Sequence, residues 1–488
     1  MHAAIDSPFA GAPGKRGPKR HRSVAARALR HLGIAFGLAG VAAAVTFRPD
    51  RAAQVAAGMA AHSLCSAVFV QGLDATATDR GLVQPILGFA GRLISYRVDL
   101  AGHAVTASFA GLAGARAEYA ADYGCRLEYP GDEPLPKPLP PAQRAVDDSF
   151  APTDPVAEMP PEIAQAIDRV FGEQPGQPIK DVKAVVVAKE GKVIAERYAP
   201  GFGIDTPLLS YSVAKSFTNA FLAVLVRQGQ LRLDQPVGAP EWRTGGDPRS
   251  SITIEDLLRM RSGLDAEESG SATDPVARME YAQADMAGFA ARRALKEPPG
   301  RTWEYTSANT LILDRLIGQT VGGGATGMRA FAQREIFDPL HMSNVTMEFD
   351  GMGVFIGSTY VYATARDYAR LGELYANHGL ASDGRRILPS GWVAWSRRST
   401  LGAPYGAGFW TNDGPSRVAV RRVANGFPRD GFFASGVLGQ RIYIVPSRHL
   451  VIARFGYSRP PDFGIDDDVR LIEAAMDPAA EPALRDQK

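Results

Sequence analysis

Cysteine is nearly absent from this chain of 488 residues, and so is any excess of charge. There are two cysteines, and the formal net charge is +2. So few cysteines exclude a disulfide-rich scaffold. The balanced charge gives no general reason to expect a nucleic-acid partner. The other residues, 45% hydrophobic and 22% charged, have globular composition, and the length suits two or three domains of about 100–200 residues.

The signatures of several catalytic mechanisms are missing as well. The chain has no Gly-x-Ser-x-Gly elbow, no His-Glu-x-x-His motif, no Walker loop and no Cys/His spacing typical of a metal site. We therefore expect neither a metal nor a cofactor. The histidines of the C-terminal part, His341, His378 and His449, are scattered and fit loop or surface positions. A Ser-His-Asp triad is therefore unsupported.

Long uncharged runs are also rare, with one exception near the N-terminus. Residues 32–47 (LGIAFGLAGVAAAVTF) carry no charge and follow seven basic residues: Lys15, Arg16, Lys19, Arg20, Arg22, Arg27 and Arg30. Such a run lies between a signal-peptide core of about 7–15 residues and a spanning helix of about 17–25. The positive-inside rule then leaves everything after the run outside the cytoplasm. A buried Ala/Gly helix is the alternative.

We expect this run to act as a single-pass signal anchor in a bacterial inner membrane, with the rest of the chain in the periplasm. Cleavage near residues 42–44, which would release a periplasmic protein, is the other possibility. Cys65 and Cys125 both follow the run and lie sixty residues apart. In an oxidising compartment they fit a disulfide worth about 4 kcal/mol in the loop-entropy model. Two buried thiols are the alternative.

Composition divides the chain into five parts. Residues 1–50 hold the basic stretch and the anchor, 51–129 form an Ala- and Gly-rich accessory segment, 130–161 a proline-rich linker, 162–478 the main domain and 479–488 a tail. In the main domain, 182–198 read as a hairpin, and 440–446 and 449–455 as paired strands. Helical spacing occurs at 212–228, 257–260, 309–317, 367–378 and 466–476. Strands at both ends predict an α/β domain with one antiparallel sheet whose first and last strands meet.

One short motif in the main domain could support catalysis. Ser212 and Lys215 stand three residues apart at a predicted helix start, so their side chains share a face. A serine hydroxyl needs a base to become a nucleophile, and a lysine can be that base once burial lowers its pKa. The first-turn N–H groups would also favour an oxyanion. Alone, such a pair could arise by chance.

Two further elements strengthen the motif. Tyr305 and Ser307 lie on a Pro/Gly-rich loop (PPGRTWEYTSAN) before a helix, where a tyrosine can relay protons and a serine can hydrogen-bond to the lysine or the substrate. The third element is residues 436–440 (GVLGQ), a glycine-bearing approach to a strand. Gly439 would let the substrate come close, and the N–H of Gln440 could complete an oxyanion hole. Taken singly, the tyrosine could be a core aromatic and the glycines a turn.

In this order the three elements resemble the penicillin-recognising serine hydrolases: class C β-lactamases, DD-peptidases, related esterases and 6-aminohexanoate-oligomer hydrolases. Residues 208–218 (LLSYSVAKSFT) are similar to the esterase and oligomer-hydrolase branch, and 252–264 (ITIEDLLRMRSGL) to the family at large. The resemblance implies a β-lactamase-like antiparallel sheet flanked by helices, with an α-helical subdomain. It also implies an acyl-enzyme on Ser212, with Lys215 as base and Tyr305 as proton relay.

The sequence departs from that family at two points. Ser307 stands where many β-lactamases have Asn, and residues 437–439 (VLG) replace a Lys-Thr-Gly triplet. The lost lysine would bind a substrate carboxylate through a bond worth about 1.5–3 kcal/mol. As strand residues, Arg441 and Arg454 are expected to face solvent rather than replace it. We therefore expect a small ester or amide substrate. β-Lactam or cell-wall peptide processing, or an inactive ligand-binding domain, are the alternatives.

Overall fold

The computed structural model describes residues 48–134, 136, 150–460 and 464–476. The chain divides into two compact units, Met1–Asp50 and Arg51–Lys488. The predicted anchor at 32–47 and the tail at 479–488 lie outside the described residues, as do residues 135 and 137–149 of the linker. The described residues belong to the second unit, except for residues 48–50.

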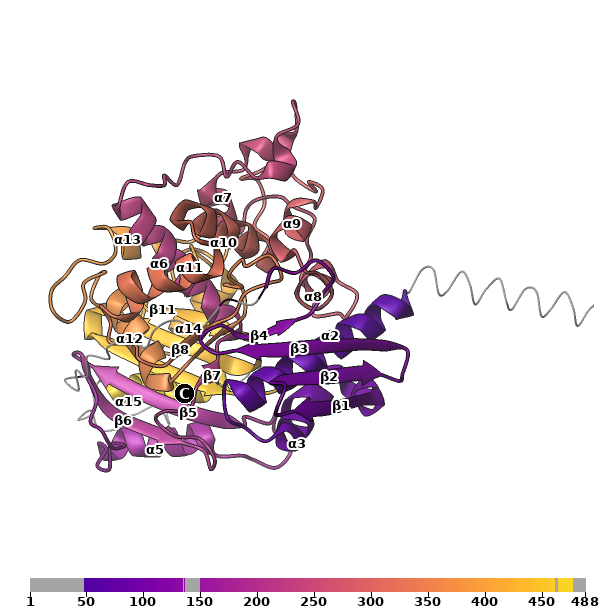
Figure 1. Cartoon of the computed structure of the whole chain (residues 1–488). Coiled ribbons are helices and arrows are strands. Elements are labelled where there is room, and N and C mark those ends of the chain that lie inside the picture. Colours follow the sequence, from indigo (N-terminus) through magenta and orange to yellow (C-terminus); the bar gives the residue numbers. More distant parts are fainter. Residues whose placement is uncertain (1–47, 135, 137–149, 461–463, 477–488) are drawn as a thin grey trace, which may run out of the picture. The chain divides into compact units, whose positions relative to one another are not determined.

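The accessory segment (residues 51–129) is a helix packed on a small sheet (Figure 1). Helix α2 (Pro49–Phe69) is followed by the short helical turns α3 (Ala75–Thr78), η1 (Asp79–Val83), α4 (Gln84–Leu87) and η2 (Gly88–Leu93). The antiparallel sheet has the order β1 (Ile94–Asp99), β2 (Ala104–Phe109), β3 (Ala113–Ala120) and β4 (Gly124–Leu127). The predicted disulfide is confirmed, since Cys65 of α2 is bonded to Cys125 of β4.

Helix α2 is long and apolar enough to cross a membrane by length and composition alone. However, 72% of its most apolar window is buried inside the protein. Its residues Met59, Leu64 and Cys65 pack against the sheet. A core helix passes the same test of length and hydropathy, so α2 by itself is weak evidence for a membrane span.

The main domain is built on a six-stranded antiparallel sheet. Its order is β10 (Trp410–Thr411), β11 (Phe432–Gly436), β12 (Gln440–Val445), β13 (Leu450–Gly456), β5 (Val182–Lys189) and β6 (Lys192–Tyr198). The last strand, β13, pairs with the first, β5, so the predicted meeting of the domain's first and last strands is confirmed. The hairpin predicted at 182–198 is also confirmed.

Helices cover both faces of this sheet (Figure 1). Helices α5 (Pro161–Phe171) and α15 (Ile465–Met476) cover one face. Helix α12 (Ala365–Ala376) packs on β12, β13 and β5 at the other face, within the large core cluster. The helical subdomain beyond it contains α6 (Ala214–Arg227), α7 (Ile254–Leu258), α8 (Pro275–Ala282), α9 (Met286–Ala291), α10 (Ser307–Val321) and α11 (Gly324–Ala332). The predicted β-lactamase-like architecture is therefore present.

Smaller elements connect these layers. A three-stranded sheet has the order β7 (Leu208–Leu209), β9 (Val361–Ala363) and β8 (Val345–Met347). The remaining helices are α13 (Trp392–Ser396) and α14 (Arg417–Ala424), and the single turns are η3 (Tyr211–Val213), η4 (Pro240–Trp242), η5 (Pro248–Ser251), η6 (Gln333–Phe337), η7 (Val437–Gly439) and η8 (Pro446–Arg448). Strand β7 and turn η3 lead directly into α6.

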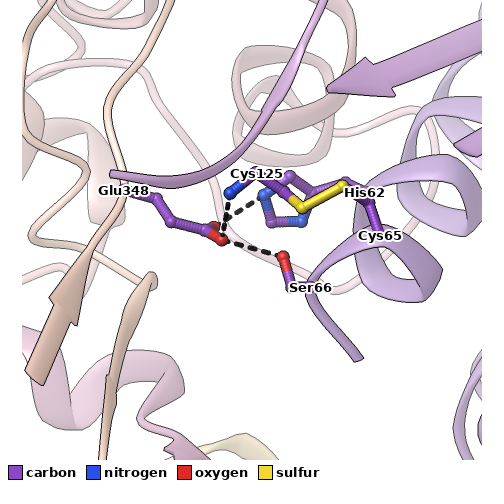
Figure 2. Close-up of a disulfide and its surroundings, with 5 residues drawn as sticks. All are labelled: His62, Cys65, Ser66, Cys125 and Glu348. Carbon is purple, nitrogen blue, oxygen red and sulfur yellow. Dashed lines mark hydrogen bonds and ion pairs between the residues drawn. A yellow bond between two sulfur atoms is a disulfide. The ribbon is translucent and has the colours of Figure 1, made fainter. Parts of the chain in front are cut away.

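A buried carboxylate joins the accessory segment to the main domain (Figure 2). Glu348, just after β8, accepts hydrogen bonds from the Ser66 hydroxyl and the Cys125 N–H, both at 2.8 Å. Its other oxygen lies 2.8 Å from Nε2 of His62. A buried charge is tolerated only when it is paired and hydrogen-bonded, and here all three partners come from the accessory segment. This segment is therefore an integral part of the folded unit.

Candidate active site

The candidate nucleophile lies at a sharp turn between β7 and α6. Tyr211, the residue before it, has a φ of 44°, an unusual value for a bulky side chain. This turn leaves Ser212 half-buried and accessible, whereas Lys215 is only 2% exposed. The Nζ of Lys215 lies 3.0 Å from Oγ of Ser212. The structure thus brings the two residues together as their spacing predicted.

Lys215 makes three hydrogen bonds, which is the full donor capacity of an ammonium. Besides Ser212, Nζ contacts Oγ of Ser307 and the carbonyl oxygen of Ser358, each at 3.0 Å. Ser307 is held at the start of α10, where the preceding Thr306 caps the helix by accepting the Ala308 N–H. The amine is therefore fixed in direction between two hydroxyls.

Burial lowers the pKa of Lys215 below its ordinary value. Three carboxylates, Glu268, Glu280 and Asp314, act in the opposite direction, but the cost of desolvating the ammonium is the larger effect. A lysine with a lowered pKa has a larger neutral fraction near neutral pH. The neutral amine can accept the proton of Ser212.

Tyr305 lies on the other side of the amine, with its ring centroid 5.0 Å from Nζ of Lys215. Burial raises the pKa of Tyr305 well above its usual value, although a hydrogen bond with Ser212 lowers it. The phenol therefore keeps its proton and can pass it on. The ring packs against Tyr405 and Trp410, with centroids 5.5 and 5.6 Å away, so an aromatic wall flanks the site.

The carboxylates near Lys215 were missed by sequence reasoning. Oε2 of Glu268 accepts the Ser307 N–H at 2.6 Å. Oε1 of Glu280 accepts the hydroxyl of Thr359 at 2.5 Å and that of Ser358 at 3.4 Å. Burial raises the pKa of Glu280 to about 7. One signal was available for Glu280, because it is an acidic residue in the mostly apolar helix α8; nothing distinguished Glu268 from a surface residue.

Residues 436–440, the third element predicted from the sequence, do not all lie at the nucleophile. Gly436, at the end of β11, lies against the nucleophile turn, since a Cβ there would be 2.5 Å from the Ser210 carbonyl oxygen. Gly439 has a φ of +86° and shapes the turn to β12. Gln440 is buried, and its side chain bonds the backbone of Gly456 in both directions. Ser212, Lys215, Tyr305 and Ser307 thus gather at one point, and Gly436 is the glycine that touches the turn.

The expectation that Arg441 and Arg454 face solvent is wrong, because both are buried. Arg441 donates to the carbonyl oxygens of Gly436 and Gln440 at 3.2 and 3.0 Å. Arg454 donates to the Gly439 carbonyl at 2.7 Å and lies 3.6 Å from Asp468. A buried guanidinium must find acceptors, and backbone carbonyls of the turn supply them. These arginines support the turn from within the protein.

Comparisons with known proteins agree with this fold. The Beta-lactamase family model matches residues 180–476. The 6-aminohexanoate-dimer hydrolase of Paenarthrobacter ureafaciens is 25% identical over 305 residues, which cover 57% of this chain and 73% of that protein.

Two solved structures show the same fold. A putative 6-aminohexanoate-dimer hydrolase from Bacillus anthracis superposes with a TM-score of 0.53 and 20% identity, covering 68% of this chain and 88% of that one. A family VIII carboxylesterase superposes with a TM-score of 0.50 and 17% identity, covering 65% and 98%.

Proposed function

Since the chain belongs to the Beta-lactamase family, we propose that it is a serine hydrolase that cleaves carboxylic esters or small amides through an acyl-enzyme on Ser212. The observation that carries this proposal is the buried amine of Lys215, held 3.0 Å from the hydroxyls of both Ser212 and Ser307. A binding protein would have no need to bury an amine at this distance from an accessible serine.

The chemistry follows from these contacts. The proton of Ser212 moves to neutral Lys215 while Oγ bonds to the substrate carbonyl carbon. When the tetrahedral intermediate collapses, the C–O or C–N bond breaks, and the leaving group takes the proton from Lys215 through the Tyr305 hydroxyl. Water then attacks the acyl-enzyme, with the same groups acting in reverse, and releases the acid and free Ser212.

The oxyanion needs two backbone donors. The N–H of Ser212, at the start of the helical turn, is the first. The sequence suggested Gln440 as the second, but the contact between Gly436 and the Ser210 carbonyl favours the N–H of Val437, the next residue. Arg441 bonds the carbonyl oxygen of Gly436, in the same peptide group as that N–H, and so holds the donor in direction.

The substrate class follows from the charges around the site. Strand β11 ends in Ala434, Ser435 and Gly436, without the cation that would bind a substrate carboxylate. Glu268, joined by Glu280 above its pKa of about 7, adds negative charge near Lys215 and disfavours an anionic substrate. An uncharged ester or amide fits these surroundings and the aromatic wall. The names of the relatives, a 6-aminohexanoate-dimer hydrolase and a family VIII carboxylesterase, support the same class.

We also propose that the enzyme acts outside the cytoplasm, in the periplasm, attached to the inner membrane by residues 32–47. The basic stretch before that run and the disulfide between Cys65 and Cys125 support this location.

Labelling experiments separate the possible activities. Purified protein is incubated with a fluorophosphonate probe and with a fluorescent penicillin, and then with a panel of nitrophenyl esters and anilides. We expect fluorophosphonate labelling that Ser212→Ala abolishes and Ser216→Ala retains, because Ser216 is a buried serine of α6 whose hydroxyl bonds the Gly408 carbonyl. Labelling of wild type by neither reagent would refute the proposal. Penicillin labelling with rapid release would instead support a β-lactamase.

A further inference from the structure

The accessory segment exposes an unusual set of large apolar side chains. Ile86, Phe89 and Leu93 come from α4 and η2, and Leu112 comes from the turn between β2 and β3. Phe89 is 78% exposed and Leu112 is 83% exposed. Soluble surfaces rarely gather such side chains in one place without a partner. We call these four residues the apolar tip.

The four side chains belong to one end of the accessory sheet. The carbonyl of Leu93 accepts the N–H of Ala110 at 2.8 Å, which joins η2 to the β2–β3 turn. Ile94, the next residue, pairs with Phe109. Ile86 and Phe89 lie within the preceding helical turns, which fold back on themselves so that Gly91 approaches Gln84. The segments that carry the four side chains of the apolar tip are therefore joined to one another at the same end of the sheet.

Within the two segments that carry the tip the charge is of one sign, and Asp79, which precedes them, is buried and accepts a hydrogen bond from Gln84. Residues 81–94 and 104–115 contain no acidic side chain, and Arg92 is their only charged residue. Its guanidinium lies 5.9 Å from the ring centroid of Phe89. Exposed apolar side chains beside a cation, with no acidic residue in the same two segments, suit a lipid interface, where the apolar groups enter the lipid and the guanidinium meets headgroup phosphates.

The direction of α2 gives a second, independent argument. Phe69, at its end, packs against His103 and Tyr119, with centroids 5.7 Å away from each. These residues lie at the opposite end of the sheet from the tip. A helix of 21 residues is about 31 Å long, and strands of six to eight residues about 20–27 Å, so α2 begins at the tip end (Figure 1). In the sequence, only Arg48 separates the uncharged run 32–47 from the first residue of α2.

We propose that the apolar tip docks into the surface of an anionic lipid bilayer and so fixes the orientation of the enzyme on the membrane. This inference rests on the proposed membrane attachment but not on the hydrolytic activity. Two anchoring signals hold a protein at a membrane in one orientation, where a single flexible attachment leaves it free to rotate.

The test uses the full chain reconstituted in vesicles of phosphatidylethanolamine and phosphatidylglycerol. Leu112→Cys offers a single free thiol for an environment-sensitive fluorophore, because Cys65 and Cys125 are disulfide-bonded. Lipids with nitroxide groups at known depths then quench the fluorophore. We expect a blue shift and a depth of about 5–10 Å within the interface. The matched control is Leu401→Cys, a 56% exposed leucine of the main domain, and its fluorophore should stay unquenched.

Three results would overturn the proposal. Equal quenching at Leu112 and Leu401 would mean that the tip does not enter the lipid. A blue shift without lipid quenching would mean that a second copy or another protein covers it. Failure of the unlabelled chain to float with vesicles would mean that the protein is not attached to the membrane. Ester hydrolysis, measured separately, would still test the proposed enzymatic function. As a further check, Phe89→Asp should reduce the quenching at Leu112, and Leu401→Asp should not.

Discussion

At the scale of single residues, the central feature is a buried amine that is shielded from solvent. Lys215 is buried and bonded to Ser212, Ser307 and the Ser358 carbonyl, and burial lowers its pKa. Because the neutral amine is the active form, the rate of acylation should rise as pH increases through this lowered pKa. Tyr305 keeps its proton throughout this range, since burial raises its pKa well above the usual value.

Removing either group should therefore slow acylation without unfolding the protein. We expect Lys215→Ala and Tyr305→Phe each to lower the acylation rate about 10²–10⁴-fold. The phenylalanine ring introduced by Tyr305→Phe would keep the contacts with Tyr405 and Trp410, so the melting temperature of this variant should match that of wild type. The burst phase with an activated ester measures the rate. Near-wild-type bursts in either variant would exclude its assigned role.

Glu280 gives a second prediction, based on pH. Its pKa is raised to about 7 in the folded protein. Between the ordinary pKa of a glutamate and about pH 7, the folded state therefore keeps the proton on Glu280 while the unfolded state has released it. The associated stability is full at low pH and is lost as pH rises to about 7, a change of up to about 3 kcal/mol. Glu280→Gln cannot ionise, so its melting temperature should fall less than that of wild type between pH 5 and 8.

Glu373 provides the matched control, because burial raises its pKa to about 7 as well, while it lines a cavity of about 510 Å³ that does not include Ser212. Both Gln variants should lose the same kind of pH dependence in melting. Only Glu280→Gln should shift the pH–rate profile, and toward lower pH, because the charge of Glu280 raises the pKa of Lys215. Equal shifts for the two variants would contradict a link between Glu280 and Lys215.

At the scale of elements, the end of β11 and the start of α6 must approach closely. Gly436 permits this, since a Cβ there would also lie 2.9 Å from Cβ of Tyr211. The approach brings the backbone donor proposed at Val437 toward the nucleophile turn. Val437 itself is 52% exposed, so this end of β11 reaches the protein surface.

Gly436→Ala should push β11 away from the turn. A displacement of about 1 Å in a catalytic group can cost about 100-fold in rate, so we expect kcat to fall on that order with a modest change in melting temperature. Gly114→Ala in β3 is the control, because its Cβ would meet only the Ala107 carbonyl, at 3.8 Å. An unchanged kcat in Gly436→Ala would exclude a donor at this end of β11.

At the scale of the whole described unit, the accessory segment and the main domain fold together. Besides Glu348 and its three partners, Gly58 of α2 lies against Tyr281 of α8, where a Cβ would clash with the carbonyl oxygen. Helix α8 also carries Glu280, so the accessory segment contacts an element of the site. One large buried junction of this kind predicts one cooperative unfolding transition.

Loss of the disulfide should therefore affect catalysis as well as the accessory segment. We expect the double variant Cys65→Ser, Cys125→Ser to lose about 4 kcal/mol of stability. Thermal inactivation of ester hydrolysis and unfolding followed by circular dichroism should shift downward together. A variant that melts in two separate steps, with hydrolysis lost only in the second, would show that the two parts are independent.

The amino-acid sequence by itself determined the features that depend on neighbours along the chain. The hairpin at 182–198 follows from two β-branched runs around a short turn, and the paired strands near the C-terminus follow from alternation; both were predicted correctly. The contact of Lys215 with Ser212 follows from helical spacing. The disulfide followed from having only two cysteines, which leaves a single possible pair. Each of these features depends on residues close together in the sequence or, for the disulfide, allows only one pairing.

Only the tertiary structure decided what surrounds the amine. Ser358 and the carboxylates Glu268 and Glu280 come from separate loops and helices, and no local period relates them to Lys215. The burial of Arg441 and Arg454 was missed for the same reason. In a strand, side-chain direction alternates predictably, but whether a face meets solvent or another layer depends on helices such as α15, which come from elsewhere in the chain.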